Sequence, residues 1–145
     1  MNQNSFLFTL HQLGAYLFVI VFILAVFSGI WGLVRKDEKW LRRGAWTFVA
    51  AFFCLSIPYL SGFALKTQLL AQADETLKAI VQKHHDLSKF VLTGTILIFG
   101  ACATILKKYK SGASLPGWLW PNLLFISWMV VTFIIRSLLQ AYRIP

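Results

Sequence analysis

Hydrophobic and polar positions along the 145-residue chain alternate in long blocks. Four apolar runs each reach the about 20 residues that a helix needs to cross the ~30 Å hydrocarbon core of a bilayer. They are Phe6–Val34, Trp46–Leu65, Leu87–Leu106 and Trp118–Leu139. The pattern predicts an all-α fold, a four-helix transmembrane bundle that forms a single integral membrane domain over residues 1–145.

The longest polar connection, residues 63–82, has its own periodicity. Leucines and other apolar residues recur at helical spacing, and Asp74 and Lys78 lie four residues apart on the polar side. We therefore predict a short amphipathic helix between the second and third spans, or a helical extension of the third span. The simpler alternative is that the segment only closes a gap. Within the second span, Pro58 predicts a kink.

Composition and charge agree with a membrane protein. Hydrophobic residues make up 58% of the chain and charged residues 13%. The net charge of +9 does not indicate nucleic-acid binding, because the basic residues gather at the ends of spans. Eight of the fourteen lie in the first and third connections: Arg35, Lys36, Lys39, Arg42, Arg43, Lys107, Lys108 and Lys110.

The positive-inside rule places these two connections in the cytoplasm. Both termini and residues 63–82 are then expected on the outer side, which is periplasmic if the membrane is a bacterial inner membrane. The N-terminus lacks the positive region of a signal peptide, so we expect the first run to remain in the mature protein. Five tryptophans near the basic connections are typical of an interfacial belt.

Several kinds of chemistry lack sequence support. The chain has no Walker loop, no GxSxG elbow, no HExxH motif and no CxxCH motif. Cys54 and Cys102 lie within spans, where small core residues are expected. Ionisable residues are absent from the middle of every span, which disfavours a transporter. The sequence therefore favours a protein without catalytic activity of its own.

All three histidines fall at one end of the predicted spans. At about 1.5 Å per residue, His11 lies about 35 Å from Val34, His85 about 32 Å from Leu106, and Arg136 about 29 Å from Gly117. His11 shares its helix face with Gly14, Ala15 and other small residues, so it is expected to point inward. At 100° per residue, Ser88, Thr95 and Cys102 share a stripe with His84, which predicts His84 rather than His85 as the inward partner.

Two inward histidines at equal depth on parallel helices suit the two axial ligands of a b-type haem. In this hypothesis His11 and His84 ligate the iron, Arg136 pairs with a propionate, and Asp86 or Tyr59 orients a histidine. The arrangement also suits a quinone head group or a metal ion. Interfacial histidines without a ligand are the structural alternative.

The chain also resembles the small bacterial four-helix membrane proteins grouped as domain of unknown function 2231. The resemblance rests on Leu10-His11, on Ser61-Gly62 where the family tends to have Thr-Gly, on the stretch 71–75, and on residues 83–86, where the family tends to have a histidine followed by Glu. It implies a redox setting, because some relatives are fused to or lie beside iron–sulfur electron-transfer proteins. Aligning on Asp86 selects His85, whereas aligning on Lys83 selects His84.

The sequence thus predicts a small redox or haem-binding subunit of a larger membrane complex, with other integral membrane subunits as partners and a possible redox partner on the outer side. The alternative is a cofactor-free accessory subunit that packs against membrane proteins or pigments.

Overall fold

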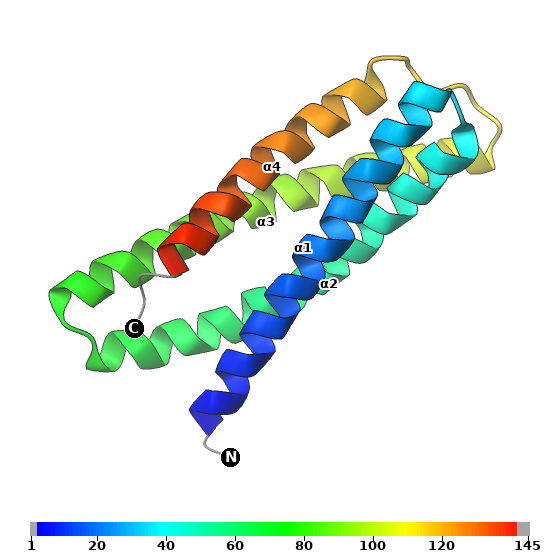
Figure 1. The fold of residues 1–145 in the computed structure, drawn as a ribbon. Helices are drawn as coiled ribbons and strands as arrows, with labels where there is room; N and C mark the ends of the chain where they lie inside the picture. The colour runs from blue at the N-terminus through cyan, green and yellow to red at the C-terminus, as the bar shows by residue number, and fades with distance from the viewer. Residues whose placement is uncertain (1–2, 142–145) are drawn as a thin grey trace.

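Four long helices make up most of the computed structural model, which describes residues 3–141. They are α1 (Gln3–Arg35), α2 (Glu38–Gln72), α3 (Glu75–Lys110) and α4 (Leu119–Ala141). The helices run up and down in an elongated bundle, with the N-terminus of α1 and the C-terminus of α4 towards the same end (Figure 1). Each is long and apolar enough to cross a membrane. The predicted four-helix transmembrane bundle is confirmed.

The segment 63–82 corrects one detail of that prediction. It forms no separate amphipathic helix, because its first part belongs to α2 and its last part to α3. The break falls at Ala73 and Asp74, where the backbone is extended. The Asp74 carboxylate accepts a hydrogen bond from the Leu77 N–H at 2.7 Å, so it caps α3 at that point. The predicted alternative, a helical extension of the third span, is present, and the second span is extended as well.

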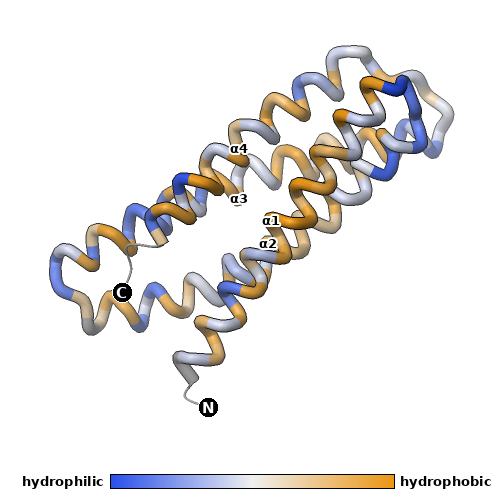
Figure 2. Tube along the Cα trace, viewed as in Figure 1, coloured by the Kyte–Doolittle hydropathy of each residue, from blue (hydrophilic) through white to orange (hydrophobic). Residues whose placement is uncertain are grey.

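The opposite end of the bundle carries the α1–α2 turn and the α3–α4 loop. Asp37 caps α2 by accepting a hydrogen bond from the Lys39 N–H at 2.8 Å. The preceding residue, Lys36, has a φ of 52°, in the left-handed region. Figure 2 shows this turn as one of the most hydrophilic parts of the chain, whereas the middles of the helices are apolar. The basic residues of both connections therefore lie at one end, as the sequence predicts.

Close packing of α1 on α2 depends on glycine. A Cβ added at Gly44 would lie 3.1 Å from the backbone nitrogen of Gly29. Bulky apolar side chains, including Phe22 and Phe48, fill the core beside this contact. Cys102 is fully buried and Cys54 is half-buried, and both are free thiols. The helix α2 continues through Pro58 without interruption.

Candidate functional site

His11 and His84 face one another near the end of the bundle where α1 begins. Their ring centroids are 6.2 Å apart and the ring planes lie at 73°. His11 is on α1 and His84 is on α3. Both of these helices begin at this end, so residues near their N-termini lie at the same level (Figure 1). The structure places His84, rather than His85, opposite His11, as the positions on the helix predict.

The His11 ring is held by α2. Its Nδ1 lies 2.8 Å from the carbonyl oxygen of Pro58. A carbonyl oxygen can only accept a hydrogen bond, so Nδ1 carries the proton and donates it. One turn along α2, Gly62 leaves room for the ring, because a Cβ there would lie 2.8 Å from His11 Cε1. Pro58 and Gly62 thus fix the orientation of His11 together.

The His84 ring is held in the same way by α4. Its Nδ1 donates to the carbonyl oxygen of Ser137 at 3.0 Å and lies 3.2 Å from the hydroxyl of the same residue. The Ser88 hydroxyl donates to the His84 carbonyl at 2.9 Å. Ser88 therefore acts as the acceptor in its 3.4 Å contact with the Ser137 hydroxyl. These contacts tie α3 to α4 around the imidazole.

Both histidines are consequently left with the same free atom. With Nδ1 donating to a carbonyl, the neutral ring has its lone pair on Nε2. Neither Nε2 forms a hydrogen bond with any of the residues that the structure describes. An imidazole whose second nitrogen donates to a backbone carbonyl is the usual arrangement of a metal-ligating histidine. The two rings are therefore prepared to bind a metal or to accept a proton.

A cavity of about 260 Å³ lies beside the two rings. All four helices contribute to its walls, which are mostly apolar. Tyr16, Tyr59 and Lys66 add polar groups to the lining, and Ser88 and Ser137 lie beside His84. The site is thus a largely apolar space inside a bundle, with a few polar residues in its lining, as is common for cofactor sites.

His85 and Arg136, the other residues predicted to bind a cofactor, lie outside this cavity. His85 does not line it and packs near Phe63, with ring centroids 6.3 Å apart. Arg136 is exposed on α4, because it precedes the inward-facing Ser137 by one residue and so points about 100° away. The structure does not bring either residue to the space between His11 and His84.

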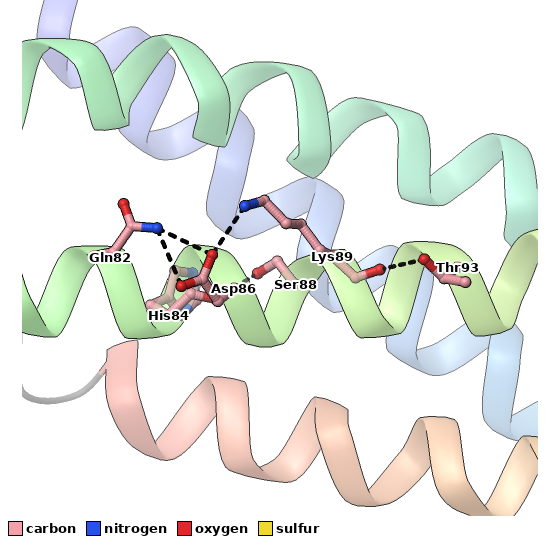
Figure 3. A network of polar contacts seen from close by, with 6 residues as sticks. All are labelled: Gln82, His84, Asp86, Ser88, Lys89 and Thr93. Carbon is pink, nitrogen blue, oxygen red and sulfur yellow. Dashed lines mark hydrogen bonds and ion pairs between the residues drawn. The ribbon is translucent and has the colours of Figure 1, made fainter.

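Asp86 and Tyr59 do not orient the histidines. The Asp86 carboxylate accepts hydrogen bonds from Gln82 at 3.0 Å and from Lys89 at 2.9 Å, all on α3 (Figure 3). Tyr59 lines the cavity, but the Nδ1 atoms of both histidines donate to backbone carbonyls instead. Backbone acceptors carry no signature in a sequence, which explains why they were not predicted.

Sequence reasoning did not assign Gly62 and Lys66 to the site, although their spacing carries a weak signal. Gly62 follows Pro58 by four residues and Lys66 follows Gly62 by four, so the three share one face of α2.

In comparisons with known proteins, no family model, no curated protein and no solved structure matches this chain. Among the described residues, no group of three or more histidine, cysteine or acidic side chains is placed to hold a metal ion.

Proposed function

We propose that the chain binds one b-type haem between His11 and His84 and serves as an electron-transfer subunit of a membrane complex. The observation that carries the proposal is the pair of opposed imidazoles, each with its Nδ1 proton donated to a carbonyl and its Nε2 free. A haem needs only two protein ligands, because the porphyrin supplies the other four. When bound, it supplies one-electron transfer.

His11 and His84 would hold the group between them, because their rings face one another with 6.2 Å between the centroids. The cavity of about 260 Å³ is smaller than a whole macrocycle. Binding would therefore widen the space between the α1–α2 pair and the α3–α4 pair.

Lys66 replaces Arg136 as the best partner for a propionate. Lys66 lines the cavity from α2, whereas Arg136 points away from it on α4. An ammonium at the outer end of the site can neutralise a carboxylate while its methylene stem covers apolar surface. In this proposal His11 and His84 bind the iron and Lys66 pairs with a propionate. His85 and Arg136 make no contact with the macrocycle.

The setting of the proposal is a multi-pass subunit of a bacterial inner membrane with its termini on the outer side. The basic connections support this orientation by the positive-inside rule. The haem would then lie near the outer surface, within reach of a redox partner there. The resemblance to domain of unknown function 2231 supports the same redox setting.

The test is the absorption spectrum of the protein purified from its native membranes, oxidised and then reduced. We expect a Soret band and a pyridine haemochrome of the b type. His11→Ala and His84→Ala should each remove the band. Each should lower the haem affinity by more than the roughly 10-fold to 100-fold that is lost when a residue hydrogen-bonded to a metal ligand is mutated. His85→Ala is the matched control and should keep the band.

Other outcomes would reassign the function. Retention in His84→Ala with loss in His85→Ala would transfer the second ligand to His85. A colourless protein from native membranes would contradict haem binding and leave a cofactor-free accessory subunit that packs against other membrane proteins.

A further inference from the structure

A second cavity lies at the opposite end of the bundle from the histidines. It has a volume of about 540 Å³ and opens between the α1–α2 turn and the α3–α4 loop. Leu33, Leu41 and Leu115 form apolar walls, and Lys36, Glu38 and Trp120 bring polar groups to it. The proposed haem site does not use any of these residues.

A buried hydrogen-bond donor lines this cavity. Trp120 is only 4% exposed, and its indole N–H has no hydrogen-bond partner among residues 3–141. The Tyr109 hydroxyl is close to this N–H, but the pair does not reach the geometry of a hydrogen bond. Buried donors in folded proteins are normally satisfied, so this N–H is available to an acceptor that enters the cavity.

The end of the bundle that carries the cavity is strongly positive, although the lining itself holds one basic and one acidic residue, Lys36 and Glu38. Eight of the fourteen basic residues lie in segments 35–43 and 107–110, against two acidic residues, Asp37 and Glu38. Within the described part of the chain, the only ion pairs are Lys78 with Glu75 and Lys89 with Asp86, both at the other end. Arg35 and Arg43 instead stack on Trp31 and Trp40, at 4.8 Å and 5.1 Å from the ring centroids.

Lys36 stands at the edge of the cavity in a conformation that favours glycine. Its φ is 52°, at the position directly after the last residue of α1. The equivalent left-handed position after α3 is occupied by Gly112, with a φ of 68°. The chain therefore places a cation next to the cavity although the backbone there is strained for a side chain.

We propose that this cavity binds the phosphate of an anionic phospholipid. Lys36 would pair with the phosphate and the Trp120 N–H would donate to the head group, while the leucine walls contact the start of the acyl chains. Basic pockets between membrane helices at the headgroup level commonly bind anionic lipids. Glu38 would oppose binding, so its removal should strengthen it.

The test is a titration of the detergent-solubilised full chain, with dissociation constants for the first bound ligand from native mass spectrometry. The three ligands are phosphatidylglycerol, phosphatidylcholine with the same acyl chains, and inorganic phosphate. Lys36→Gln should weaken phosphatidylglycerol binding about tenfold, the loss of one hydrogen-bonded charge. The matched control Lys110→Gln removes an exposed charge at the same end outside the cavity and should change it less than twofold.

Two further variants make the assignment specific. Trp120→Phe removes the N–H and replaces the indole of a core residue by a smaller ring, so it should weaken phosphatidylglycerol binding, and the void it leaves should also lower the thermal stability of the lipid-free protein. Glu38→Gln should strengthen binding.

The remaining outcomes each decide against the proposal. Equal losses in Lys36→Gln and Lys110→Gln would mean diffuse charge attraction and would overturn the site. Equal binding of phosphatidylcholine would remove the role of lipid charge. If inorganic phosphate saturates the cavity and phosphatidylglycerol binds no more tightly, the cavity is a site for free phosphate and the lipid proposal is overturned.

Discussion

Gly62 of α2 lies directly against the imidazole of His11. A methyl group at Gly62 would come within 2.8 Å of His11 Cε1 and 2.9 Å of Nδ1, closer than real contacts allow. The ring cannot turn aside freely, because its Nδ1 is bonded to the Pro58 carbonyl on the same helix. The position of the proposed ligand therefore depends on the absence of one side chain.

We predict that Gly62→Ala displaces His11 and lowers the free energy of unfolding by about 1–3 kcal/mol, the usual effect of overpacking. Haem content should fall at the same time. Gly100→Ala is the matched control, because a Cβ there meets nothing within 4 Å and alanine favours a helix. It should stabilise the protein by up to about 1 kcal/mol. Thermal unfolding in detergent and haem content measure both, and equal behaviour of the two variants would refute the contact.

The hydropathy pattern was sufficient to predict the four helices, because membrane spans follow from length and apolarity alone. It did not place the boundary between α2 and α3, since the amphipathic periodicity of residues 63–82 runs through Asp74. The cap formed by the Asp74 carboxylate on Leu77 sets that boundary, and Asp74 was read only as a polar-face residue.

The site could be predicted only in part, because tertiary packing decides several of its contacts. Angular position on a helix was enough to select His84 over His85. The carbonyls of Pro58 and Ser137 belong to neighbouring helices, so they emerge only from tertiary packing. Arg136 illustrates the same limit. Its depth was estimated from the length of the helix, but its direction depends on the rotation of α4, which Ser137 fixes by facing His84.

Gly44 provides a test of helix packing. Its missing side chain allows the α2 backbone to approach Gly29 of α1, with only 3.1 Å between the Gly29 nitrogen and an added Cβ. We predict that Gly44→Leu separates α1 from α2 and strongly reduces recovery of folded, monodisperse protein. Ala50→Leu, at an exposed position on α2, should be recovered like the wild type. Size-exclusion chromatography in detergent compares them, and equal recovery would show that the contact is not essential.

Replacing Lys36 by glycine should stabilise the protein rather than destabilise it. Because its φ of 52° is strained for a side chain, Lys36→Gly should raise the free energy of unfolding by about 1 kcal/mol in lipid-free detergent. Gly112→Ala, at the matching position after α3, should lower it by about the same amount. Chemical denaturation of the two variants beside the wild type measures this difference. A destabilised Lys36→Gly would mean that the lysine side chain contributes more than the strain removes.

The orientation in the membrane is also open to a direct test. The positive-inside rule predicts that Lys39 faces the cytoplasm and Ala71 the outer side. In intact cells, a membrane-impermeant thiol reagent should label Ala71→Cys and spare Lys39→Cys until the cells are lysed. The wild type, whose Cys54 is half-buried and whose Cys102 is fully buried within helices, controls for background labelling. The reverse pattern would place the histidines on the cytoplasmic side.

The most direct test of the central claim is a haem titration of the detergent-solubilised apoprotein, followed by absorbance. The wild type and His85→Ala should each bind one haem per chain and give the low-spin spectrum of an iron with two imidazole ligands. His11→Ala and His84→Ala should lose that spectrum. One low-spin haem per chain in His84→Ala, or none in the wild type, would contradict the assignment of His11 and His84 as a ligand pair.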